Sequence, residues 1–299
     1  IMKRMYGITT AMLTPVNENG EVLVKELEDY VEFLIEKGVH CLYPLGSIGE
    51  MNLLRLEQRK LAAKTVIDKV NGRIPVFVHI GAVRTEDTME LARHAYAAGA
   101  DGIGAVTPSY WPFKRHEVIA FYKELSKQVP EDFPIYMYNI PQYSTIDVTT
   151  EMAEEITSCC KNITGIKYSV GNMARTQEYL KIKTNDFSVI QGGDLLTTLA
   201  LSLGCDGVIS GYSSVFPEYF VNIYNCYKAG RFDEANALQR EITDLTSFMK
   251  KEISTIPKLK AYLSLRGIQG GVCQRPFQMP SPEQEAELKN NLRKYKVIL

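Results

Sequence analysis

The sequence lacks the charge imbalance and the long apolar runs that mark several classes of protein. Its 34 Lys and Arg residues are balanced by 35 Asp and Glu residues, and both kinds alternate within short segments such as 25–29. No patch of one sign therefore indicates a nucleic acid or a membrane surface as a partner. No apolar run is as long as a transmembrane helix, and no signal-like segment opens the chain. We expect a cytoplasmic protein that binds neither nucleic acid nor membranes.

Metal-ligand patterns are also missing. The six cysteines, at positions 41, 159, 160, 205, 226 and 273, have no CxxC spacing, and the four histidines form no HExxH motif. Such spacings are what bring zinc ligands together in known sites. We expect the cysteines to be buried free thiols, the histidines to be packing or surface residues, and the protein to use no metal and no other cofactor.

A regular alternation of strand-like and helix-like segments is present instead. Short β-branched or aromatic runs are followed by Gly- and Pro-rich loops and then by amphipathic helical patterns. The predicted strands are residues 7–11, 40–45, 75–80, 102–107, 135–139, 164–167, 188–191 and 207–210. The predicted helices between and after them are residues 24–36, 56–69, 87–98, 117–127, 150–159 and 216–227.

Eight such units favour a closed (β/α)8 TIM barrel of the α/β class, because the strands are continuous apolar runs that need cover on both faces. An open dinucleotide-binding sheet is disfavoured, since no GxGxxG follows the first strand. After about residue 230 only helical patterns remain, at 232–251, 256–266 and 282–296. The prediction is a barrel over residues 1–230 with a C-terminal helical extension over residues 231–299.

Lys167 ends one of the predicted buried strands, after the apolar run Ile163-Thr164-Gly165-Ile166. Burial disfavours the ammonium form, so a buried lysine has a lowered pKa and its free amine can form a Schiff base with a carbonyl substrate. The alternative is a structural lysine whose amine extends from the strand end to water.

Other polar groups are predicted at the same end of the barrel, where the C-terminal ends of the strands carry the site in this fold. They lie in segments that each follow a predicted strand: Gly46-Ser47-Ile48-Gly49-Glu50, Thr107-Pro108-Ser109-Tyr110-Trp111, Tyr138-Asn139-Ile140-Pro141, Gly192-Gly193-Asp194 and Ser210-Gly211. In order and spacing, together with Lys167, these segments resemble the dihydrodipicolinate synthase and N-acetylneuraminate lyase family of class I, Schiff-base pyruvate aldolases. The resemblance covers essentially the whole chain.

The resemblance implies a role for each of these groups. Lys167 would form the Schiff base with pyruvate or a longer 2-oxo acid, and Tyr138 would be the acid and base. Ser47 and Tyr110 would share its proton in a hydroxyl relay, with the family's Tyr110 equivalent reaching in from a neighbouring subunit of a homotetramer. From the residues alone, Tyr138 is equally compatible with a core aromatic, and Ser47 with a turn or helix-capping residue.

The substrate carboxylate is expected at Ser47 and Ile48, where backbone amides form an anion site. Most relatives carry Thr or Ser in place of Ile48, so one side-chain donor is missing here. A lost charge-assisted hydrogen bond costs on the order of 1.5–3 kcal/mol, which weakens binding by one or two decades.

Two comparisons within the family bear on the substrate. Dihydrodipicolinate synthases have an arginine two residues after the proline of the YNxP turn, where it binds the carboxylate of the aldehyde partner. This chain has Gln142-Tyr143 there, which argues against lysine biosynthesis as the main role. N-acetylneuraminate lyases have a hydroxyl two residues after the lysine and a Gly-x-Asp-Glu segment. This chain keeps Ser169, Gly192 and Asp194, but Leu195 replaces the glutamate.

The leading hypothesis is therefore an aldolase that cleaves or forms a hydroxylated 2-oxo acid, giving pyruvate and an aldehyde. The substrate would be of the 2-keto-3-deoxy sugar acid or N-acetylneuraminate type, with Ile48, Ser169, Gly192, Asp194, Ser210, Gly211 and Tyr143 as candidate binding residues. Asp194 is also a candidate cap for the helix that follows it, and Tyr143 either lines the pocket or turns outward. The alternatives are a dehydratase on the same substrates, a dihydrodipicolinate synthase, and a non-catalytic 2-oxo acid binding protein.

Overall fold

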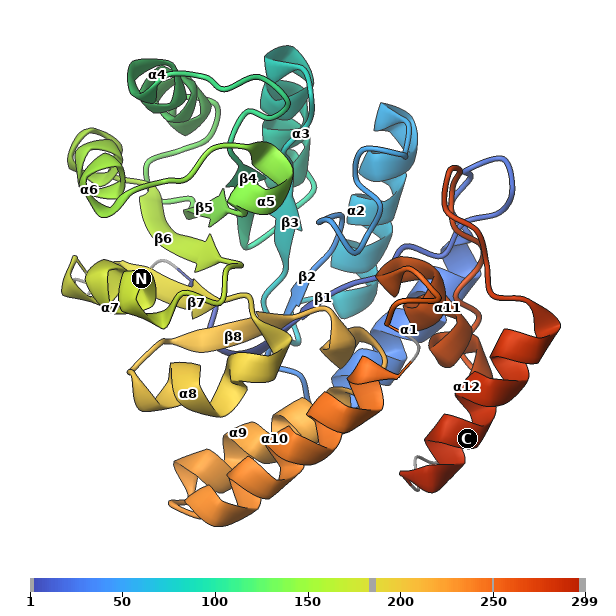
Figure 1. The fold of residues 1–299 in the computed structure, drawn as a ribbon. Helices are drawn as coiled ribbons and strands as arrows, with labels where there is room; N and C mark the ends of the chain where they lie inside the picture. Colours follow the sequence, from blue (N-terminus) through green and yellow to red (C-terminus); the bar gives the residue numbers. More distant parts are fainter. Residues whose placement is uncertain (1–2, 183–186, 249, 296–299) are drawn as a thin grey trace.

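Eight parallel strands form a barrel in the computed structural model, which describes residues 3–182, 187–248 and 250–295 (Figure 1). The strands are β1 (Gly7–Ala11), β2 (Cys41–Tyr43), β3 (Phe77–His79), β4 (Gly102–Val106), β5 (Ile135–Asn139), β6 (Ile163–Tyr168), β7 (Ser188–Gln191) and β8 (Gly207–Ser210). Their order is β2-β1-β8-β7-β6-β5-β4-β3. A parallel bridge between Leu42 and Val76, with Leu42 N donating to Pro75 O at 3.0 Å, joins β2 to β3. The predicted (β/α)8 fold is confirmed.

Helices surround the barrel and continue beyond it. Those that follow the strands are α1 (Val24–Glu36), α2 (Leu56–Val70), α3 (Thr85–Ala97), α4 (Arg115–Ser126), α5 (Pro141–Ser144), α6 (Thr150–Cys159), α7 (Met173–Lys181), α8 (Thr197–Ser202) and α9 (Pro217–Lys228). Single 3-10 turns, η1 (Asp194–Leu196) and η2 (Tyr212–Ser214), precede α8 and α9. The C-terminal helices are α10 (Phe232–Ser247), α11 (Thr255–Leu265) and α12 (Pro282–Lys294). None of the helices within the described ranges is long and apolar enough to cross a membrane.

The elements follow from the side-chain pattern. Each residue of β1 to β8 is buried, as expected for strands covered on both faces. In α1 the buried residues Leu27, Tyr30, Val31 and Leu34 recur at helical spacing and form one apolar face. Ser281 and Gln284 form a capping box at the start of α12.

Some predicted bounds and burials were wrong. Strands β2 and β3 are shorter than predicted, because Pro44 and Pro75 flank them and proline lacks the amide that a strand ladder needs. Helices α5, α7 and α8 were not predicted. Helix α7 buries only Thr176 and Tyr179, and α8 has six residues, so neither offers a long series of buried positions. Cys159 is exposed rather than buried, at the solvent-facing end of α6, whereas the other cysteines are buried as expected.

The C-terminal helices return to the start of the chain. Helix α10 lies against α9, and the segment after α11 runs beside the loop after β1, where Val272 N donates to Val16 O at 2.9 Å (Figure 1). Helix α10 ends at Ser247, before the predicted end, and the predicted helices at 232–251 and 282–296 include residues 249 and 296, which lie outside the described ranges. A structural boundary at residue 230 stays a prediction.

Candidate active site

Lys167 is buried near the C-terminal end of β6, with 4% of its surface exposed. Its Nζ lies 3.8 Å from the centre of the Tyr138 ring and 4.6 Å from the centre of the Tyr43 ring. Burial lowers the pKa of this amine below its usual value, and Tyr138 and Asp194 oppose the shift. The side chain therefore does not extend to water, and its amine is less basic than that of an exposed lysine.

Tyr138 faces Lys167 because the two residues are paired across β5 and β6. Its hydroxyl lies 3.4 Å from Ser47 Oγ, at the outer limit of a hydrogen bond. The structure thus brings together three groups that the sequence places on three different strands or loops: an amine, a phenol and an aliphatic hydroxyl.

The loop after β2 carries Ser47 and Ile48, both half-buried. The Ile48 side chain turns toward β8, since a Cβ added at Gly211 would lie 3.1 Å from its Cδ1. It packs against a buried cluster that includes Tyr43 and Ile209. The Ile48 side chain has no hydrogen-bond donor, so only its backbone amide is available to an anion, and the carboxylate site at Ser47 and Ile48 stays a prediction.

Tyr43 and His79 also border the site, and the sequence reasoning did not single them out as functional. Tyr43 is fully buried, and a Cβ added at Gly104 would lie 2.2 Å from its hydroxyl oxygen. His79 Nδ1 lies 3.1 Å from Leu45 O, and its Nε2 accepts from Val106 N at 3.2 Å. Burial holds the pKa of His79 well below its usual range. Buried aromatic residues in strands are normally core, so the sequence carries no signal for this arrangement.

The Asp194 side chain accepts hydrogen bonds from the turn after β8, and not, as predicted, from the helix that follows Asp194. Its Oδ1 accepts from Ser210 Oγ at 2.5 Å and from Tyr212 N at 3.1 Å. The side chain thus caps the turn after β8, and its own helical turn is supported by its backbone oxygen, which accepts from Thr197 Oγ1 at 3.3 Å. Burial raises the pKa of the Asp194 carboxyl, and the Ser210 hydrogen bond acts in the opposite direction. The predicted cap on the following helix is therefore wrong, because neither η1 nor α8 has a side-chain cap, and a role for Asp194 as a substrate ligand stays a prediction.

Ser169 and Gly192 are adjacent at the ends of β6 and β7. A Cβ added at Gly192 would lie 1.9 Å from Ser169 Oγ, so only glycine leaves room for that hydroxyl. Gln142 Nε2 donates to Ser169 O at 2.7 Å, which ties α5 to the same strand end.

Two predicted site residues do not join this group within one chain. Tyr143 is 72% exposed and turns outward. Tyr110 is 76% exposed, with a positive φ of 75° and its ring against that of Trp111. A non-glycine residue at such a φ is uncommon and indicates a local constraint.

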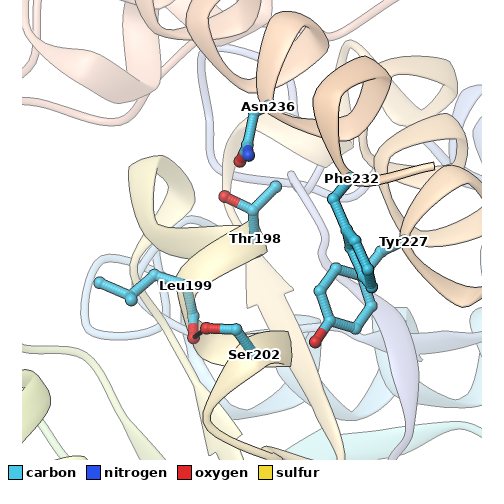
Figure 2. A pocket seen from close by; sticks show the side chains of 6 residues that line it. All are labelled: Thr198, Leu199, Ser202, Tyr227, Phe232 and Asn236. Carbon is cyan, nitrogen blue, oxygen red and sulfur yellow. Dashed lines mark hydrogen bonds between the residues drawn. The ribbon is translucent and has the colours of Figure 1, made fainter. Parts of the chain in front are cut away.

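A separate pocket of about 380 Å³ lies outside the barrel, between α8 and the helices α9 and α10 (Figure 2). Thr198, Leu199, Ser202, Tyr227, Phe232 and Asn236 line it. It contains none of the predicted site residues and no amine or carboxylate. The grouping of ionisable side chains, rather than the presence of a hollow, therefore makes Lys167 the candidate reactive residue.

A barrel with a buried lysine at the end of a strand is typical of class I lyases, the enzymes that work through a lysine Schiff base. The sequence model of the Dihydrodipicolinate synthetase family matches residues 4–295, and the chain belongs to this family. Its members are Schiff-base pyruvate aldolases and synthases.

Individual relatives cover the whole chain. The 4-hydroxy-tetrahydrodipicolinate synthase of Syntrophus aciditrophicus (strain SB) is 31% identical over 98% of this chain and 99% of its own. A prophage protein of the dihydrodipicolinic acid synthase family from E. coli K12, solved in complex with pyruvate, has a TM-score of 0.92 and 27% identity over 98% of this chain and 99% of its own. CdNal from Clostridium difficile, solved in complex with mannosamine, has a TM-score of 0.92 and 26% identity over 98% of this chain and 100% of its own.

Proposed function

We propose that the protein is a pyruvate aldolase that cleaves or forms a hydroxylated 2-oxo acid of the 2-keto-3-deoxy sugar acid or N-acetylneuraminate type. The observation that carries the proposal is the buried Lys167 amine beside Tyr138, whose hydroxyl lies 3.4 Å from Ser47 Oγ. A lowered pKa leaves more of the amine unprotonated near neutral pH, and the phenol and hydroxyl provide a path for a proton.

The reaction follows from these positions. The Lys167 amine attacks the C2 carbonyl, and loss of water gives a protonated imine. Tyr138 relays the proton of the C4 hydroxyl while the C3–C4 bond breaks; the electrons of that bond move into the imine, and the aldehyde leaves. The same relay returns the proton to C3 of the resulting enamine, and water then releases pyruvate and restores the amine.

The remaining residues support a hydroxylated tail. The Ser169 hydroxyl packs on Gly192, and Asp194 holds Ser210 and the amide of Tyr212 at the end of β8. The pyruvate complex of the E. coli K12 relative and the mannosamine complex of CdNal agree with a 2-oxo acid half and a sugar-like half. A side-chain carboxylate is absent at position 195, where Leu195 is 42% exposed, and this favours a shorter tail than that of sialic acid.

Dihydrodipicolinate synthesis is the second candidate, because the curated relatives at 31% and 32% identity bear that name. The residues of α5 argue against a dihydrodipicolinate synthase. The Gln142 amide is bound to Ser169 O, and Tyr143 is exposed, so neither supplies the cation that would bind a second carboxylate.

Borohydride reduction with and without pyruvate, followed by peptide mapping, tests the Schiff base. A pyruvate-dependent adduct on Lys167 is expected, and its absence from the folded wild-type protein would overturn the proposal. The identity of the second half is tested by incubating the enzyme with 2-keto-3-deoxy sugar acids and N-acetylneuraminate and measuring the pyruvate released. A product that keeps the carbon skeleton intact would indicate a dehydratase, and an adduct with no turnover of any acid would indicate a binding protein.

A further inference from the structure

The C-terminal helices reach the carboxylate-binding loop through one buried ion pair. Lys260, on α11, has its Nζ 2.7 Å from Glu50 Oε1, and both side chains are fully buried. The same Nζ donates to Val272 O at 2.6 Å, and Glu50 Oε2 accepts from Gln274 N at 2.8 Å. Both carboxylate oxygens are therefore held by residues that follow the barrel.

Glu50 lies in the loop between β2 and α2, two residues after Ile48. Its backbone has a positive φ of 59°, and that of Leu45, in the same loop, is 64°. Such conformations are costly for residues other than glycine and persist only where the surroundings enforce them. Within the loop, Glu50 N donates to Ser47 O at 3.2 Å, and Gly49 O accepts from Thr14 Oγ1 at 3.0 Å.

We propose that Glu50 and Lys260 are positioning residues, which hold the Ser47 hydroxyl and the Ile48 amide in the orientation that binds the carboxylate of the 2-oxo acid. The inference rests on the proposed function and makes the C-terminal extension part of the substrate site. Its physical basis is the cost of an unpaired buried charge: removing either partner leaves the other without compensation, and the loop must then shift to expose it. The effect on binding is direct, because Ile48 contributes only its backbone to the anion site.

Helix α11 provides a matched control. Lys258 is also buried, with 1% of its surface exposed, but its Nζ donates to Thr246 O and Phe248 O, both at 3.0 Å, at the end of α10. Lys258 and Lys260 are thus two buried lysines on one helix, and only Lys260 contacts the loop in the described structure. If a substitution acts only by lowering stability, replacing either lysine should have a similar effect on pyruvate binding. If it acts by displacing the loop, only the replacement of Lys260 should weaken pyruvate binding.

The test measures the pyruvate concentration that gives half-maximal borohydride trapping, for the wild type, Lys260→Met, Glu50→Gln and Lys258→Met. We expect Lys260→Met and Glu50→Gln to raise this concentration at least about tenfold, with a much smaller change in the rate at saturating pyruvate, since Lys167 and Tyr138 are untouched. Lys258→Met should change it by less than about twofold even where it lowers Tm. An unchanged value for both Lys260→Met and Glu50→Gln, or an equal rise in Lys258→Met, would overturn the inference.

The double variant E50Q/K260M separates positioning from stability. It removes both buried charges, so Tm should recover toward the wild-type value while pyruvate binding stays weak. Recovery of binding together with Tm would show that the pair has only a structural role. Amide exchange in peptides covering residues 46–51 gives a readout that does not depend on imine formation, and faster exchange is expected in Lys260→Met but not in Lys258→Met. Failure of the wild type to trap pyruvate would overturn the proposed function itself and is seen before any variant is compared.

Discussion

Burial of the Lys167 amine makes it more reactive and at the same time lowers the stability of the fold. Its surroundings are two aromatic rings and the interior of a barrel, and they lower the pKa of the amine. Between this lowered pKa and the ordinary value of 10.5, the unfolded chain binds more protons than the folded one. The stability of the fold therefore rises with pH across that window, and at neutral pH the lysine is a destabilising residue.

Lys167→Met is expected to abolish pyruvate trapping and to stabilise the protein. Methionine fills a similar volume without a buried amine, so the free energy of unfolding at pH 7 should rise by about 1 kcal/mol, which is about 2–4 °C in Tm. Thermal unfolding beside trapping measures both effects. A lower Tm would show that the amine is satisfied in the folded state and contributes to stability.

Burial and Tyr138 have the larger effects on the pKa of Lys167, and Asp194 should add a smaller one to the pH at which this amine reacts. Imine formation needs the free amine, so the trapping rate is expected to rise with pH and to level off below the ordinary lysine value of 10.5. The Asp194 carboxylate raises the pKa of Lys167, so Asp194→Asn should move the midpoint of this profile to lower pH. Ser210→Ala keeps the charge and removes the hydrogen bond to Asp194 together with the one that Ser210 Oγ accepts from Ser213 N, so its midpoint should stay at the wild-type value. Trapping rates measured across pH compare the three proteins, and an upward shift in Asp194→Asn would contradict this assignment.

At the scale of strands and loops, the alternation along the chain predicts the barrel and the end of it that carries the site. The strands that are continuous apolar runs were placed correctly, because their burial on both faces leaves a clear mark in the sequence. Helices α7 and α8 were missed, since short helices with few buried residues lack such a mark. The position of Lys167 was predictable because its strand is one of these apolar runs. The contact between Ser169 and Gly192 was not, because it depends on the relative positions of the ends of two neighbouring strands.

Gly192→Ala tests that contact between the ends of β6 and β7. The added Cβ would lie 1.9 Å from Ser169 Oγ, so the hydroxyl must move away from the tail-binding position. We expect the KM for the hydroxylated 2-oxo acid to rise about tenfold, which corresponds to about 1.4 kcal/mol, while pyruvate trapping changes little. Gly193→Ala is the control, because the nearest atoms to its added Cβ all belong to the Leu196 side chain, at 3.1 Å or more. Steady-state kinetics on the same acid distinguish the two, and equal effects would argue against a specific role for Ser169.

For the whole molecule, the exposed pair of Tyr110 and Trp111 favours an association between chains. These aromatic side chains are 76% and 63% exposed, and aromatic residues of this kind are enriched at interfaces between subunits. We predict a homotetramer in which Tyr110 enters the relay of a neighbouring subunit. Sedimentation should give four times the chain mass of 33.7 kDa, and a monomer at working concentrations would contradict it.

Tyr110→Phe should lower turnover by about 10²-fold or more with a smaller effect on substrate affinity, because it removes a proton-sharing hydroxyl and keeps the ring at the interface. Tyr96→Phe is a control at another partly exposed tyrosine, 46% exposed on α3, and should leave turnover unchanged. The split between kcat and KM decides the outcome, and a loss confined to KM would exclude Tyr110 from proton transfer.

Three features could be predicted from the residues alone: the alternation of strands and helices, the strand that carries Lys167, and the family. Each depends on local periodicity or on short motifs in a fixed order. Which polar groups share a partner became visible only in the folded chain. Asp194 is held by the turn after β8, Ser47 meets Tyr138, and Glu50 is bound by Lys260 from a helix near the other end of the chain. Such pairings depend on closure of the barrel and on the path of the C-terminal segment. Both bring together residues that are far apart in the chain, so the local sequence around each residue carries no periodic signal for the contact. A lone Glu50 or Lys260 is an ordinary charged residue in the sequence, and only burial beside its partner makes it part of the site.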